Sequence, residues 1–197
     1  MAISYPLALP TITGFRSVEL SARTAVAMVM SPFTGEQQVY AWPGQWWSWS
    51  VSLPPMTEAE AAVWAGFFLA LNGPEGTFYL GPAVRTVTGG TAAGAWAVNT
   101  GAVANSTTLP ITGGTGSFAV GDWLQVGATT ASKLHRVTQV NVGSVDVFPR
   151  LRSAYAGATA ITYTNPKGIF RLAGIPSESY DTAIISNGMN FGAIEAL

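Results

Sequence analysis

Few side chains in this sequence could carry out acid–base or metal chemistry. The single histidine, His135, stands between Leu134 and Arg136, and this alternation predicts that its imidazole lies on the solvated face of a strand. The nearest acidic residues along the chain are Asp122 and Asp146, and their spacing matches no metal-ligand motif. We therefore expect no metal site.

Other common catalytic arrangements are missing from the sequence as well. There is no cysteine, which excludes thiolate nucleophiles, disulfides and cysteine-based metal centres. No Gly-x-Ser-x-Gly nucleophile elbow occurs. The glycine-rich runs at 89–90 and 113–116 lack the Gly-Lys-Ser sequence of a phosphate-binding loop, so we expect both to be turns. We predict no catalytic residue and no cofactor, and expect that the protein is not an enzyme.

One helix is clearly predicted, over residues 57–72. Thr57 and Glu60 match a capping box, in which each side chain accepts a hydrogen bond from the other residue's backbone amide. Asn72-Gly73 predicts a left-handed C-cap, and Pro74 cannot continue the helix. One apolar stripe should pack on a sheet, and it is formed by Val63, Trp64, Phe67, Phe68 and Leu71.

The strand expected just before this helix, residues 46–53, alternates large apolar residues with serines. Its apolar face, which we expect to meet the helix, consists of Trp47, Trp49, Val51 and Leu53. Trp42 and Trp46 flank a predicted turn at Trp42-Pro43-Gly44-Gln45. They are therefore expected to be free to anchor a partner, as aromatic residues often do at interfaces.

The composition divides the chain into three zones. Residues 1–82 hold long strand candidates, residues 83–166 are rich in Gly, Ala and Thr with short strand candidates, and residues 167–197 resemble the first zone. Many short strands with frequent turns are typical of a small barrel or sandwich. We predict a mainly β protein. Its discontinuous outer β-sandwich or barrel domain (1–82 plus 167–197, with the packed helix 57–72) carries an inserted small β-barrel domain (83–166).

The chain of 197 residues is poor in charge. It is 48% hydrophobic and only 10% charged, against about 25% charged residues in a typical soluble domain. This indicates that neighbouring molecules cover much of the surface. No run approaches the ~20 apolar residues of a membrane-spanning helix, so we expect no membrane span. The net charge of -1 predicts no general attraction to nucleic acid.

The charges that remain are unevenly distributed. Residues 1–82 carry two arginines against five glutamates, whereas residues 133–171 carry six basic residues against one aspartate. These side chains are either scattered and solvated, or they form surfaces of opposite sign that meet within one chain or between copies.

The order and spacing of several segments resemble those of a known family. A tryptophan-containing helix, 64–73, leads into Gly76-Thr77-Phe78-Tyr79-Leu80-Gly81. Further segments follow in matching order: Gly121-Asp122-Trp123-Leu124, Phe148-Pro149-Arg150-Leu151-Arg152, Asn165-Pro166-Lys167-Gly168 and Phe191-Gly192-Ala193-Ile194-Glu195. From about Gln38 onward the chain thus resembles tail proteins of long-tailed bacteriophages and prophages, and among these it is most similar to distal tail proteins.

This resemblance implies a structural protein of the virion, assembled in the host cytoplasm and located at the tail tip. Distal tail proteins form a ring, commonly a hexamer, that joins the tail tube to the hub of the tip or baseplate. The expected partners are other copies of the chain, the tail tube protein and the hub protein. From chain position we expect Arg16, Trp42 and Trp46 at contacts between copies, and Arg150 and Arg152 at contacts made by the insert.

Two alternatives remain at this stage. The inserted domain could recognise a host-surface glycan, which would make the protein a receptor-binding tail module. A tail-associated peptidoglycan hydrolase would instead need an essential carboxylate, for which the candidates are Asp122, Asp146 and Glu75.

Overall fold

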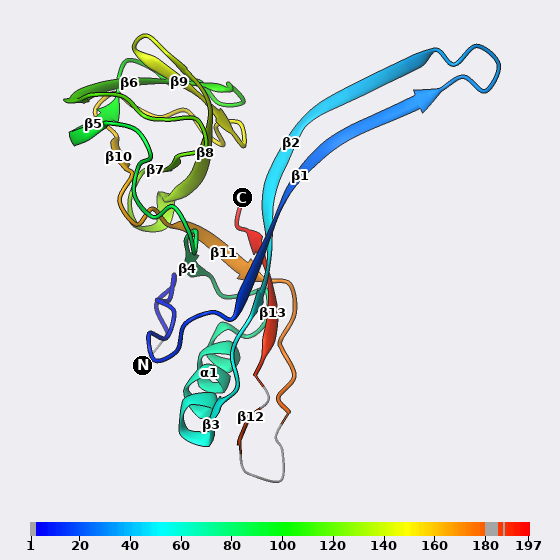
Figure 1. Cartoon of the computed structure of the whole chain (residues 1–197), viewed down its shortest axis with the longest axis vertical. Helices are drawn as coiled ribbons and strands as arrows, with labels where there is room; N and C mark the ends of the chain where they lie inside the picture. The colour runs from blue at the N-terminus through cyan, green and yellow to red at the C-terminus, as the bar shows by residue number, and fades with distance from the viewer. Residues whose placement is uncertain (1–2, 180–184, 187) are drawn as a thin grey trace.

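The computed structural model describes residues 3–179, 185–186 and 188–197. In this part of the chain the fold is mainly β, with a single α-helix, an antiparallel sheet and a separate closed barrel (Figure 1). The predicted mainly β class with one packed helix and a small barrel is therefore confirmed. The outer sandwich or barrel that we expected is instead a single open sheet, because β1 (Ser17–Met30) and β4 (Phe78–Leu80) lie at its two opposite edges. The outer part is an open five-stranded sheet, and the helix packs with it in one hydrophobic core.

The sheet is built from strands at both ends of the chain. Its order is β1-β2-β13-β11-β4, and its strands are β1 (Ser17–Met30), β2 (Gln37–Ser52), β13 (Asn190–Glu195), β11 (Gly168–Leu172) and β4 (Phe78–Leu80). All the neighbouring strands are antiparallel. A second, two-stranded sheet joins β3 (Met56–Thr57) to β12 (Ile185–Ser186).

The closed barrel lies between β4 and β11 in the sequence. Its order is β10-β5-β6-β9-β8-β7, and its strands are β5 (Ala93–Val98), β6 (Thr108–Thr115), β7 (Trp123–Val126), β8 (Lys133–Asn141), β9 (Ser144–Phe148) and β10 (Ala160–Thr162). A short 3-10 helix, Thr129–Ala131, precedes β8. Because β11 pairs with β4, with Gly168 opposite Leu80, the chain enters and leaves the barrel segment at adjacent points. Such an arrangement allows a segment to be inserted without disturbing its host sheet.

The helix forms for the local reasons visible in its sequence. Helix α1 spans Glu58–Leu71, with the capping box between Thr57 and Glu60 present and Asn72 left-handed at φ 50°. The predicted stripe is correct except for Val63, which is 50% exposed. Ala61 takes its place on the buried face, because it lies three residues before Trp64 and therefore on the same side of the helix. No helix in the described ranges has the length and apolar character needed to cross a membrane.

The tryptophans of β2 join the sheet to the barrel. Trp47, Trp49, Val51 and Leu53 are all buried, which confirms the predicted apolar face. However, the rings that Trp47 meets belong to the barrel: its centroid lies 5.0 Å from those of Trp123 and Phe148. The helix instead packs on Phe191 of β13, through Trp64 and Phe68. One aromatic core thus connects the helix, the sheet and the barrel.

The predicted turn at Trp42-Pro43-Gly44-Gln45 is wrong, because β2 runs through it without a break. The pairing with β1 shifts there: Thr24 lies opposite Gln45, while Val26 lies opposite Ala41. The extra residues of β2 form a bulge. Proline lacks an amide hydrogen and is tolerated in a sheet at such an irregularity, so Pro43 marks a bulge rather than a chain reversal.

Candidate assembly surface

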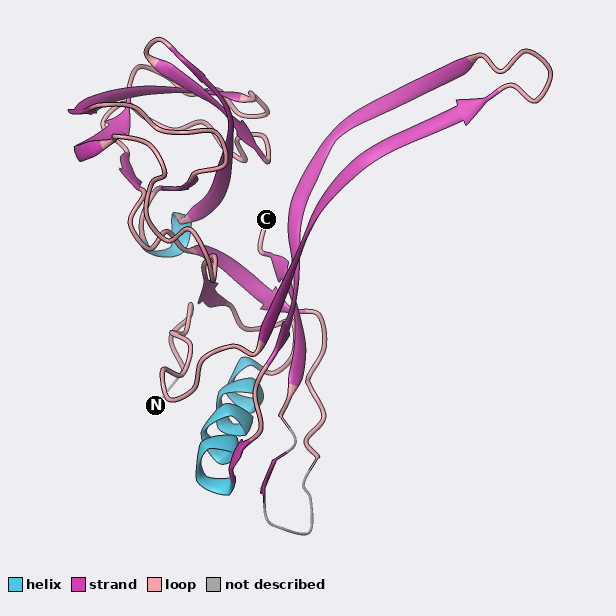
Figure 2. Cartoon of the chain, viewed as in Figure 1, coloured by secondary structure: helices cyan, strands magenta, loops and turns pink. Residues whose placement is uncertain are grey.

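A long β-hairpin projects from the body of the molecule (Figure 2). We call residues 24–45 the arm; it comprises the outer parts of β1 and β2 and the turn between them. Strand β13 pairs only with the stretch of β2 from Ser48 to Ser52, and β1 is the edge strand of the sheet. Among the described residues the two strands of the arm therefore pair only with each other, and no described strand pairs with either of their outer edges.

Apolar side chains cover both faces of the arm. The large ones are between 47% and 95% exposed, and they are Val26, Met28, Val29, Met30, Phe33, Val39, Tyr40 and Trp42. Met28 lies opposite Val39, and Ala27 lies opposite Tyr40 on the other face. The one charged residue of the arm is Glu36. An isolated two-stranded ribbon is at best marginally stable in water, and a large exposed apolar patch marks an interaction site.

The sequence-predicted residues Trp42 and Trp46 occupy different positions relative to the arm. Trp42 lies on it, is 56% exposed and stacks on Tyr40 with the ring centroids 6.4 Å apart. Trp46 lies at its base, opposite Arg23, and is half-buried. Their contact with another copy stays a prediction. The remaining apolar residues of the arm were missed, although a 22-residue stretch with a single charge was a visible signal.

A groove of about 460 Å³ opens at the base of the sheet, between the start of β1 and the barrel. Its apolar wall includes Phe15, Leu20, Trp49, Val84 and Trp123. Three arginines line it as well, namely Arg16, Arg85 and Arg136, and we call it the arginine groove. These arginines come from segments far apart in the sequence, so only the folded chain brings them together.

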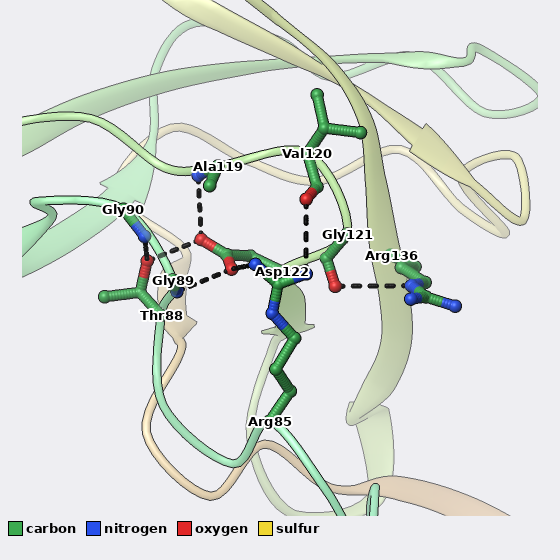
Figure 3. Close-up of polar contacts among 9 residues, drawn as sticks. All are labelled: Arg85, Thr88, Gly89, Gly90, Ala119, Val120, Gly121, Asp122 and Arg136. Atoms are coloured by element: carbon green, nitrogen blue, oxygen red, sulfur yellow. Dashed lines mark hydrogen bonds and ion pairs between the residues drawn. The ribbon is translucent and has the colours of Figure 1, made fainter.

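A buried carboxylate fixes one side of the arginine groove (Figure 3). Asp122 accepts hydrogen bonds from the Thr88 hydroxyl and from the amides of Gly89 and Ala119, and it lies 3.5 Å from Arg85. Burial alone would raise the pKa of Asp122. The hydrogen bonds and the charge of Arg85 outweigh burial and hold this pKa below its ordinary value. The carboxylate therefore stays ionised and anchors the loop that carries Arg85.

The guanidinium groups of Arg85 and Arg136 are neighbours. Arg136 Nε donates to the carbonyl of Gly121 at 3.2 Å, and its guanidinium lies 5.3 Å from the centre of the Trp123 ring. Both groups lie next to Gly121: a Cβ atom placed on this glycine would be 2.7 Å from Arg85 Nη1 and 3.6 Å from Arg136 Nη2. Arg16 is exposed, and no described residue forms a hydrogen bond or ion pair with its side chain. The arginine groove can therefore accept an anionic group beside an apolar one.

Arg152, which we expected at a contact with another molecule, has a partner within the chain. Its Nη2 lies 2.7 Å from Oε2 of Glu195, and the Glu195 side chain is 1% exposed. The same carboxylate oxygen accepts the backbone amide of Trp47 at 3.1 Å. This ion pair connects the barrel segment to β13 and β2, so the charge of Arg152 is neutralised inside the molecule.

Arg150 also contributes a contact within the chain. Its backbone amide donates to the side-chain carbonyl of Gln45 at 2.8 Å, which ties the base of the arm to the barrel. Its Nη1 donates to the carbonyl of Asn105 at 3.2 Å. The predicted role of Arg150 between copies stays a prediction.

His135 is buried, so the prediction of a solvated imidazole is wrong. Its Nδ1 lies 2.8 Å from the carbonyl of Pro149, and burial lowers its pKa to about 4, helped by the charges of Arg152 and Lys133. Alternation failed here because β8 is covered on both sides: the neighbouring Leu134 is buried in the core shared with the sheet. Among the described residues, no cluster of histidine and acidic side chains could hold a metal ion.

A scan against models of protein families finds no match, and a search of the curated proteins finds none either. Inference about function therefore depends on the residues of the chain and on the two surfaces described above, the arm and the arginine groove.

Proposed function

We propose that this chain is a structural protein of a bacteriophage tail. In this proposal it is a distal tail protein whose copies form a ring, a hexamer by resemblance, that joins the tail tube to the hub of the tail tip or baseplate. The observation that carries the proposal is the arm, whose two faces are apolar and exposed and whose two edges pair with no strand in the part of the chain that the structure describes.

Assembly into a ring would remove each of these features. An arm laid along the next copy would have its edges and faces covered there, and repetition of this contact by rotation closes the copies into a ring. A ring closed in this way leaves no arm edge free, which prevents uncontrolled pairing with other chains. The faces of the arm would be covered inside the assembly and by the neighbouring tail proteins, which accounts for the low charge of the chain.

Three further points favour the ring over the alternatives. Residues 83–166 contain two tryptophans. Trp123 is buried, and Trp96 is half-buried, with the backbone of Gly114 against its indole and the Phe118 ring 5.0 Å away, so this segment has no exposed tryptophan on which a glycan could stack. Asp122, a carboxylate that a hydrolase would need, is buried and bonded on both oxygens. The resemblance to tail proteins also spans both the sheet and the barrel.

The experiment that tests the proposal is direct. The purified chain should form a ring of defined copy number, seen by negative-stain electron microscopy and by light scattering on a sizing column as its concentration is raised. In phage particles the ring should lie at the junction of tube and tip, where antibody labelling can place it. A protein that stays monomeric at high concentration and is missing from intact virions would refute the proposal.

A further inference from the structure

We propose that the arginine groove of each copy receives the tip of the arm of the next copy. The tip is the turn at residues 31–36: Phe33 enters the apolar part of the groove, and the carboxylate of Glu36 binds its arginines. This inference rests on the proposed function, because it names the second contact that holds neighbouring copies of the ring together.

The tip presents an aromatic ring and a carboxylate together. Phe33 is 95% exposed, and Glu36 is the one acid of the arm. The turn that carries them is closed by backbone hydrogen bonds, from Ser31 to the carbonyl of Glu36 at 2.8 Å and from Gly35 to the carbonyl of Ser31 at 3.0 Å. The hydroxyl of Ser31 accepts from Thr34 at 3.3 Å as well. A turn held in this way loses little conformational freedom on binding.

The arginine groove has the complementary chemistry. Its volume of about 460 Å³ lies within the range of small-ligand sites, and its wall is formed largely by apolar and aromatic side chains. Arg85 already faces Asp122, but Arg16 is without a partner among the described residues, and Arg136 contacts a carbonyl and a tryptophan ring. A carboxylate brought in by another molecule would therefore meet uncompensated positive charge.

The geometry requires this contact to be between copies. The groove is lined by the start of β1, Arg16 to Leu20, and Phe33 lies 13 residues beyond Leu20 along the same hairpin. At about 3.3 Å per residue the tip is roughly 40 Å from the groove of its own copy. Figure 1 shows the arm directed away from the barrel. Tip and groove are different surfaces, so their contact is head-to-tail and generates a ring when the rotation closes.

Charge reversal tests the contact. We expect Glu36→Arg and Arg16→Glu each to weaken ring formation at least tenfold, measured as the concentration at half-assembly by sedimentation velocity. The combination of the two should restore most of the loss, because the reversed charges attract. Phe33→Ser should weaken assembly to a similar degree. Glu19→Arg is the matched control, since it makes the same change on β1 at a position that does not line the groove, and it should assemble as the parent chain does.

The outcomes separate this inference from the proposed function. A parent chain that never assembles would refute both. Rings that form equally well in all the variants, or charge reversals whose effects simply add, would overturn the contact while leaving the ring itself in place. Normal rings of Arg16→Glu that fail to enter tails would assign the groove to the tube or hub protein and would likewise overturn the contact.

Discussion

Replacing an exposed apolar pair of the arm by a charged pair should strongly weaken ring formation while leaving the monomer folded. The change is Met28→Lys with Val39→Glu. These residues lie opposite each other on one face of the arm, and each is 59% exposed. Opposite charges directly across a strand pair attract each other, so the hairpin keeps its register and the net charge of the chain does not change.

The expected size of the effect follows from the area that each side chain still exposes. Complete burial of a valine or methionine side chain contributes roughly 1.5–3 kcal/mol. With more than half of each side chain exposed in the monomer, assembly would gain roughly 1–1.5 kcal/mol per residue, or about 2–3 kcal/mol for the pair. A change of 1.4 kcal/mol is tenfold, so each contact between copies should weaken by about 30- to 150-fold.

Sedimentation velocity over a range of concentrations measures this change, and circular dichroism checks that the fold is retained. A matched control is Val103→Lys with Val142→Glu, which makes the same kinds of substitution at exposed valines of the barrel segment. We expect this control to assemble as the parent chain does. Equal assembly of the arm variant and the parent chain would show that the arm faces are not buried between copies, and the reasoning from exposure would then be wrong.

Three further predictions concern the stability of the monomer. Arg152→Met should lower the free energy of unfolding by about 3–5 kcal/mol, because it leaves the buried carboxylate of Glu195 without its partner. Urea denaturation measures this change, and Lys167→Met, at an exposed position, is the control. Equal effects of the two substitutions would contradict the importance of the buried ion pair. The pKa of His135 is lowered from 6.5 to about 4, so the unfolded chain binds its proton first as the pH falls. The contribution of His135 to stability should therefore be constant above about pH 6.5, fall by about 3 kcal/mol between pH 6.5 and 4, and be constant again below pH 4. His135→Asn should remove that dependence, and an unchanged pH profile would dismiss the assignment. Thr57→Ala should cost about 1 kcal/mol through loss of the N-cap, whereas Thr57→Ser should not, as thermal unfolding will show.

The sequence predicted well those features that depend on neighbouring residues. The capping box of Thr57 and Glu60 and the left-handed Asn72 were predicted because both involve hydrogen bonds or backbone angles within one turn of chain. Alternation in residues 46–53 identified the buried face of β2 because side chains of a strand point to opposite sides in turn.

Patterns that depend on what lies against a strand were predicted less well. His135 has the alternation of a surface strand, but both faces of β8 are covered there: Leu134 lies in the core shared with the sheet, and Val137, on the same face as His135, lies in the core of the barrel. Alternation along one strand cannot show that distant segments cover its second face. Pro43-Gly44 has the composition of a turn, and only the pairing of β2 with β1 shows that it is a bulge in a continuous arm.

By itself, the sequence determined that this is a β-rich chain with one capped helix and little charge. Only the tertiary structure decided which residues meet across long separations. It pairs Arg152 with Glu195, gathers Arg16, Arg85 and Arg136 around one groove, and leaves the arm projecting from the sheet, with no further described strand paired to its edges. The physical reason is that local hydrogen bonds and alternation are encoded within a few residues. Burial and charge pairing depend instead on which surfaces the whole chain brings together.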